Sequence, residues 1–306
     1  MEGTTDRSLT AENTRSLRFF LAMTVVMCHA ASVFGIALPK MLHIIVCAFF
    51  FLSGYGLHES LKNKEGYLRN FVPRRYPALL IPYFICYTVM AVVAGIFLFS
   101  YTDIPRLILD YVFLFPLHWF VMELLIFYTI FYFVFLFARG TKALVAVTVL
   151  CTASALILTH QYGILYGASF MGFPFGIFFS MFGAGRWIKR NNKVVIVALL
   201  ALLAVLFPIY EYTWGLPFVL LIISLRMFFF ERYEGSRVHR AISKCGSFSY
   251  ELFLIHWTFL LVIERYTDWL PLKIALAAVI PCLAAYPVYR LSRAVLNKYN
   301  KALDRN

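Results

Sequence analysis

The feature of this sequence that most constrains its fold is a succession of apolar stretches, each about 20 residues long. A stretch of that length crosses the hydrocarbon core of a bilayer as one helix. About ten follow one another: 17–34, 41–58, 78–100, 118–138, 142–159, 165–184, 194–209, 214–230, 249–265 and 271–292. We therefore expect an all-α, polytopic integral membrane protein, a single domain over residues 1–306 with short cytoplasmic tails.

The composition agrees with a membrane protein. The chain is 14% charged and 62% hydrophobic, whereas a soluble domain has roughly 25% charged and about half apolar residues. The first apolar stretch is not followed by a small-residue cleavage site, which indicates a retained helix rather than a signal peptide. The six cysteines occur singly and are typical of small core residues, so neither a disulfide framework nor a metal site is expected.

The net charge of +13 would suit nucleic acid binding, so the placement of the basic residues decides its meaning. If the N-terminus is cytoplasmic, the exceptions to an inner location among the 28 basic residues are Lys40, Arg106, Arg265 and Lys273. This asymmetry follows the positive-inside rule and predicts that both termini are cytoplasmic. No nucleic acid partner is expected. The apolar segment Ile104–Pro116 is short and bounded by prolines, which suits an interfacial or re-entrant piece.

Ionisable residues within apolar stretches are costly and therefore functional candidates. Arg18 and His29 lie eleven residues apart, which on a helix places them on one face within about 20° and about 16 Å apart along the axis. Such a face would present a cation near the cytoplasmic surface and an imidazole beyond the midplane. Alternatively, Arg18 extends to the lipid headgroups while His29 hydrogen-bonds a neighbouring helix.

Glu123 and His256 also lie inside apolar stretches. Glu123 could orient or charge-stabilise an imidazole, or be a structural acid paired with a buried base. His256 could be catalytic or a satisfied structural histidine. These alternatives stay open because helix packing cannot be read from the sequence.

Two further motifs are of interest. The loop after the second stretch carries basic residues that could bind the phosphates of a nucleotide-containing donor, or merely fix topology and touch anionic lipid. They are Lys62, Lys64, Arg69, Arg74 and Arg75. Ser53, before Gly54, is either a nucleophile or a small packing residue, and no G-x-S-x-G elbow surrounds it.

Four motifs occur in order along the chain: Arg18 with ten residues before His29; Phe49-Phe50-Phe51-Leu52-Ser53-Gly54-Tyr55; Arg74-Arg75 leading into Leu80-Ile81-Pro82-Tyr83; and Ser249-Tyr250 with Leu254-Ile255-His256-Trp257. Together they resemble the membrane acyltransferase 3 family, bacterial polytopic enzymes that O-acylate carbohydrates and related acceptors. Trp119-Phe120 followed by Tyr128 also looks like a pattern of that family. One position departs from it: the family commonly has a second basic residue where this chain has Ala78. The donor phosphates would then be contacted differently, or by Arg74, Arg18 or Arg186.

The resemblance implies a multi-pass enzyme of the bacterial inner membrane. It implies acetyl-CoA or another acyl-CoA as the cytoplasmic donor substrate, with no permanently bound cofactor, and a hydroxyl of a cell-surface or lipid-linked glycan as acceptor. Catalysis is then assigned to His29 and Glu123. Substrate binding is assigned to Arg18, Arg74, Arg75, Ser53, Trp119 and His256.

In this interpretation His29 is a general base or a covalent carrier of the acyl group. Two other classes remain open, a transporter or flippase of a lipid-linked glycan and a non-catalytic membrane scaffold. The acyl chain, the identity of the acceptor and the oligomeric state are not fixed by the sequence.

Overall fold

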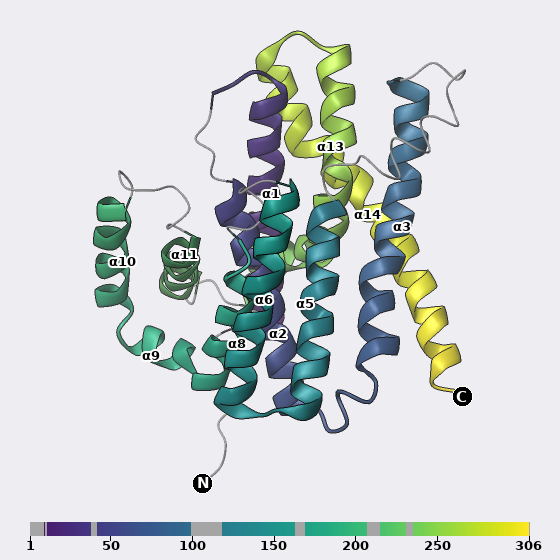
Figure 1. Cartoon of the computed structure of the whole chain (residues 1–306). Coiled ribbons are helices and arrows are strands. Elements are labelled where there is room, and N and C mark those ends of the chain that lie inside the picture. Colours follow the sequence, from purple (N-terminus) through teal and green to yellow (C-terminus); the bar gives the residue numbers. More distant parts are fainter. Residues whose placement is uncertain are drawn as a thin grey trace. The chain divides into compact units, whose positions relative to one another are not determined.

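The computed structural model describes residues 9, 11–37, 42–98, 118–162, 169–206, 215–230 and 235–305 (Figure 1). All regular elements in these residues are helices. They are α1 (Ala11–Val33), α2 (Leu42–Asn63), α3 (Phe71–Phe97), α5 (His118–Phe137), α6 (Gly140–Tyr162), α8 (Gly172–Phe182), α9 (Ala184–Arg190), α10 (Asn192–Leu206), α11 (Gly215–Phe230), α12 (Arg237–Cys245), the 3-10 helix η5 (Gly246–Phe248), α13 (Ser249–Tyr266) and α14 (Leu270–Leu303).

Six helical segments in the described residues are long and apolar enough to cross a membrane. They are Glu12–Val33, Phe71–Phe97, Trp119–Phe137, Gly140–Leu158, Arg237–Tyr266 and Leu270–Leu303. The prediction of an all-helical membrane protein is thereby confirmed. The number of ten crossings and the cytoplasmic location of both termini stay predictions, and Ile104–Pro116 lies outside the described residues.

The chain divides into two compact units, each drawn from three segments. Unit 1 comprises residues 1–21, 40–70 and 123–243, and unit 2 comprises residues 22–39, 71–122 and 244–306. The prediction of one domain over residues 1–306 is not tested by this division.

Unit 1 is organised around a close crossing of α2 and α8. A Cβ atom added at Gly54 would lie 2.1 Å from the backbone oxygen of Phe173, and one at Gly176 would lie 2.1 Å from that of Phe51. Only glycine allows two helix backbones to approach so closely. Gly54 in the Phe-Phe-Phe-Leu-Ser-Gly-Tyr motif is thus a packing residue.

The other end of α8 is also set by a glycine. Gly183 follows α8 with a φ of 61° in the left-handed region, and its N–H donates to the carbonyl of Phe179. Such a residue ends a helix by satisfying a carbonyl of its last turn. The helix in the predicted apolar stretch 165–184 therefore ends at Phe182, and a separate helix, α9, begins at Ala184.

Unit 2 is built on α3, α13 and α14, which pack pairwise against one another (Figure 1). Hydrogen bonds join α13 to the α3 segment near both ends of α13. The Tyr250 hydroxyl donates to the Leu79 carbonyl at 3.1 Å, and Arg265 Nη1 donates to the carbonyl of Leu98, directly after α3, at 2.7 Å. These bonds fix the position of α13, the helix that carries His256.

The α2–α8 crossing generates a first prediction. Gly176→Ala would place a methyl group against the Phe51 carbonyl, and we expect it to lower the free energy of unfolding by about 3 kcal/mol or more, the upper end of overpacking costs. Gly56→Ala is the matched control on α2, because no atom lies within 4 Å of its added Cβ and alanine favours the helix. Thermal unfolding of both purified variants in detergent checks this, and equal midpoints for the two would contradict the crossing.

Candidate active site

Two histidines from distant parts of the sequence are in contact in unit 2. His29 on α1 and His256 on α13 are joined by a hydrogen bond of 2.8 Å between His29 Nδ1 and His256 Nε2. The other nitrogen of His256, Nδ1, lies 2.7 Å from the Phe253 carbonyl oxygen. His256 is fully buried, whereas His29 is partly exposed.

The partners of His256 determine which nitrogen carries each proton. The Phe253 carbonyl can only accept, so His256 Nδ1 is the donor in that bond. In the neutral pair, His256 Nε2 then has a lone pair and accepts the proton of His29 Nδ1. His29 is consequently held in the tautomer whose Nε2 has a free lone pair. That nitrogen can accept a proton or act as a nucleophile.

Apolar groups lie against one side of the histidine pair. The edge of the Trp257 ring lies against His29, with centroids 5.2 Å apart and planes at 88°. The next residue on α1, Ala30, belongs to a buried cluster with Leu260, Ile263 and Ala277. These contacts restrict the movement of the His29 ring and keep water from its neighbours on this side.

Arg18 lies on the same helix as His29, because α1 is continuous from Ala11 to Val33. The spacing argument of the sequence therefore applies to a real helix. Arg18 is half-buried and interacts with other groups of the protein.

Glu123 is fully buried in unit 1, and neither of its carboxylate oxygens has a hydrogen-bond partner among the described residues. One turn further along α5, Phe127 packs between Phe50 and Phe173, with ring centroids 5.1 Å from each. A buried carboxyl without partners is energetically costly and indicates a functional group. Its pairing with an imidazole stays a prediction.

The remaining predicted residues occupy varied surroundings. Arg74 forms an ion pair with Asp304 of α14, and both side chains are exposed. Arg75 is half-buried and has interaction partners.

Trp119 contacts Phe120 edge to face, and Phe120 in turn packs on Phe253, one turn from His256. Ser53 is half-buried beside Gly54, and its role as a substrate ligand stays a prediction.

Among known protein families, the acyltransferase domain model of the acyltransferase 3 family matches residues 15–290. That range contains both histidines of the pair and nearly all the described helices. The chain belongs to this acyltransferase family. No curated protein and no solved structure matches it. Together with its membrane-like helices, the match makes the protein a membrane acyltransferase.

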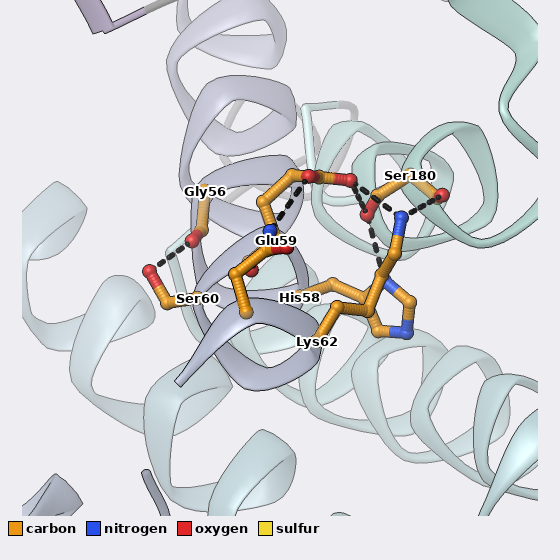
Figure 2. Close-up of polar contacts among 7 residues, drawn as sticks. Gly56, His58, Glu59, Ser60, Lys62 and Ser180 are labelled. Atoms are coloured by element: carbon orange, nitrogen blue, oxygen red, sulfur yellow. Dashed lines mark hydrogen bonds and ion pairs between the residues drawn. The ribbon is translucent and has the colours of Figure 1, made fainter. Parts of the chain in front are cut away.

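The acyltransferase has a second polar site that the sequence did not reveal (Figure 2). His58, Glu59 and Lys62 on α2 meet Ser180 on α8, all within unit 1. The Ser180 hydroxyl donates to Glu59 Oε1 at 2.6 Å, so it accepts from His58 Nδ1 at 2.7 Å. Lys62 Nζ donates to Glu59 Oε1 at 2.9 Å and to the Ser180 carbonyl at 3.2 Å. We call these four residues the α2–α8 polar cluster.

Burial and charge act in opposite directions on Glu59 in this cluster. Burial raises the pKa of Glu59. The hydrogen bonds from Ser180, Lys62 and Asn63, together with the charge of Lys62, lower this pKa by more than burial raises it. The resulting pKa lies below the ordinary value of 4.5. Glu59 is therefore a carboxylate at neutral pH and accepts all its hydrogen bonds.

Sequence reasoning selected His29 and His256 but could not join them, because they lie 227 positions apart. The α2–α8 polar cluster was missed for the same reason, since Ser180 is 121 positions from Glu59. A signal was present: His58 and Glu59 stand side by side at the end of an apolar run. Adjacent ionisable residues at that place require partners.

The lowered pKa of Glu59 predicts how stability depends on pH. A carboxylate with a depressed pKa stabilises the folded state above its unfolded pKa, and this contribution is lost as the pH falls through the folded value. As the pH is lowered below 4.5, we expect the thermal midpoint of the wild type to fall more steeply than the midpoint of Glu59→Gln. Midpoints measured from pH 7 to pH 3 check this. Parallel curves for the two proteins would show that Glu59 is not held as a carboxylate by Ser180 and Lys62.

Proposed function

We propose that this membrane acyltransferase moves an acyl group, in the simplest case acetyl, from cytoplasmic acyl-CoA to a hydroxyl of a cell-surface or lipid-linked glycan. The proposal places it in the bacterial cytoplasmic membrane. The observation that carries the chemistry is the hydrogen bond between His29 and His256, since it leaves a basic nitrogen at His29 Nε2. The donor and the acceptor are those that the family resemblance implies.

In the proposed reaction His29 Nε2 removes the proton of the acceptor hydroxyl while the hydroxyl oxygen attacks the thioester carbonyl. The C–O bond forms, the C–S bond breaks, and the proton on His29 passes to the departing CoA thiolate. The products are the acyl ester and CoA, with no net change in protons.

His256 acts in this scheme through His29. Its Nδ1–H is fixed by the Phe253 carbonyl, so its Nε2 must face His29 as an acceptor. This arrangement selects the tautomer and orientation of the base, the task of the orienting group in a catalytic triad. His256 is thus assigned as a positioning residue.

A covalent route starts from the same tautomer. His29 Nε2 would attack the thioester carbonyl, CoA would leave, and the acyl-imidazole would then pass its acyl group to the acceptor. Brief mixing with labelled acyl-CoA in the absence of acceptor separates the two routes, because only the covalent route leaves label on His29.

The phosphates of acyl-CoA are assigned to Arg18, Arg74 and Arg75, the residues in the family motifs. Arg74 is held by Asp304, and this exposed ion pair is weak enough for a phosphate to displace. Ala78 stands where relatives commonly have another basic residue, so these arginines would contact the donor without the help of that residue.

Substitution of the histidines tests the mechanism. We expect His29→Ala to lower kcat by roughly 10²- to 10⁴-fold, the usual contribution of a general base. His256→Ala should lower kcat by at least roughly 10²-fold because His29 is no longer oriented. His256→Gln should restore part of the rate, since its amide oxygen can accept from His29. Release of free CoA and labelling of source glycans by labelled acetyl-CoA measure the rate.

His160 supplies the control for these variants. It is exposed near the end of α6, so His160→Ala should transfer at the wild-type rate. Undiminished transfer by folded His29→Ala would end both the general-base and the covalent schemes. A wild type that neither binds acetyl-CoA nor releases CoA would instead favour a transporter or a scaffold.

Glu123→Gln tests the second catalytic assignment. If Glu123 stabilises the charged form of an imidazole, the neutral amide should lower kcat with little change in the KM for acyl-CoA. We expect a loss of at least about tenfold in kcat, because a buried charge interaction is worth more than about 1.4 kcal/mol. Steady-state kinetics with the same glycan measure it, and full activity of Glu123→Gln would remove Glu123 from the mechanism.

A further inference from the structure

The α2–α8 polar cluster joins two helices at the end of α2 that leads into a basic loop. Three of its hydrogen bonds run between α2 and α8: His58 to Ser180, Ser180 to Glu59, and Lys62 to the Ser180 carbonyl (Figure 2). His58 and Ser180 are 6% and 2% exposed. Buried, hydrogen-bonded polar groups favour one geometry, because another arrangement would leave the bonded atoms unpaired.

Lys62 has a structural role in this cluster. Its ammonium group bonds the Glu59 carboxylate and the Ser180 carbonyl in the last turn of α8. A cation at that place satisfies a free carbonyl and complements the negative end of the helix dipole. Lys62 is therefore already neutralised, although it belongs to the basic loop in the sequence.

The residues that follow present other cations. Lys64 and Arg69 are exposed, and neither forms an ion pair within the described part of the chain. Glu65, between them, is also exposed. The loop turns at Gly66, whose φ is 63° and whose carbonyl accepts from the Arg69 N–H at 3.0 Å. Lys64 is the first residue after α2, so the position of Lys64 depends on where α2 ends.

We propose that His58, Glu59 and Ser180 are positioning residues that hold the end of α2 so that Lys64 and Arg69 bind phosphate groups of acyl-CoA. The inference rests on the proposed donor. Lys62 anchors this loop and is not a phosphate ligand. The ligand chemistry is that of a phosphate monoester or diphosphate, which two ordered cations can recognise.

The sign of one substitution separates this proposal from simple charge attraction. Glu59→Gln removes a negative charge and frees Lys62, so attraction alone would strengthen the binding of a polyanion such as CoA. Loss of the cluster would instead loosen the loop and weaken binding. We expect weaker binding.

Calorimetric titration of CoA, which binds without reacting, is the decisive experiment. It uses the purified full chain in nanodiscs of neutral lipid. We expect Ser180→Ala, Glu59→Gln and the double variant Lys64→Ala/Arg69→Ala each to raise the Kd by about tenfold, the loss of two modest ionic contacts. Ser180→Thr, which keeps the hydroxyl, should bind like the wild type. Ser154→Ala is the matched control, because that hydroxyl bonds only a carbonyl of its own helix.

Each outcome has a distinct meaning. If the wild type binds CoA and folded Ser180→Ala and Glu59→Gln bind it equally well, the positioning role is overturned. If the double variant binds CoA normally but loses affinity for vesicles containing anionic phospholipid, the loop recognises lipid headgroups and the proposal is again overturned. If the wild type binds no CoA, the proposed donor itself fails. A thermal midpoint for each variant confirms that a folded protein was titrated, and Glu59→Gln, which preserves shape, serves where Ser180→Ala does not fold.

Discussion

The absence of water from the hydrocarbon core is the constraint on which this structure depends, because a polar group there must find its partner within the protein. The His256 imidazole meets this requirement with the carbonyl of its own helix on one side and His29 on the other. In water the same imidazole could rotate and exchange partners freely. Within apolar helices the pairing fixes at once the side-chain orientation, the tautomer and the free nitrogen of His29.

Glycine performs the corresponding task for the backbone in unit 1. The α2 and α8 backbones can approach closely only because Gly54, Gly172 and Gly176 lack side chains at the crossing. Apolar attraction between helices is weak in lipid, so close packing and interhelical hydrogen bonds supply the association. The α2–α8 polar cluster lies beyond this crossing on α2 and adds directional bonds to close contact. The two features together make α2 and α8 one packed element.

The helices were predictable because the mean hydropathy of a segment depends only on the residues of that segment. No knowledge of tertiary contacts is needed. The positions of α5 and α6 follow the apolar stretches to within about three residues at their ends. The helices α1 and α3 begin six and seven residues before the predicted starts, and α14 ends eleven residues after the predicted end. His29 and His256 were selected by the same local rule, that an ionisable residue in an apolar stretch is exceptional. Their hydrogen bond was not predictable, since it depends on how α1 packs against α13. For Ser53 the sequence left a nucleophile and a packing role open, and both stay open. The neighbouring Gly54 is a packing residue, because its added Cβ would meet the Phe173 carbonyl.

The neutral partner of His29 also bears on the kind of reaction that this site can serve. In a triad, a carboxylate stabilises the imidazolium that forms when the base takes up a proton. Among the described residues, the hydrogen-bond partner of His29 is an imidazole whose own proton is held by a backbone carbonyl. Such a partner orients the base well but stabilises its positive charge less than a carboxylate would. The arrangement therefore suits an acyl donor that is already activated, as a thioester is, better than the cleavage of an amide. This reasoning supports the thioester donor that is proposed from the family resemblance.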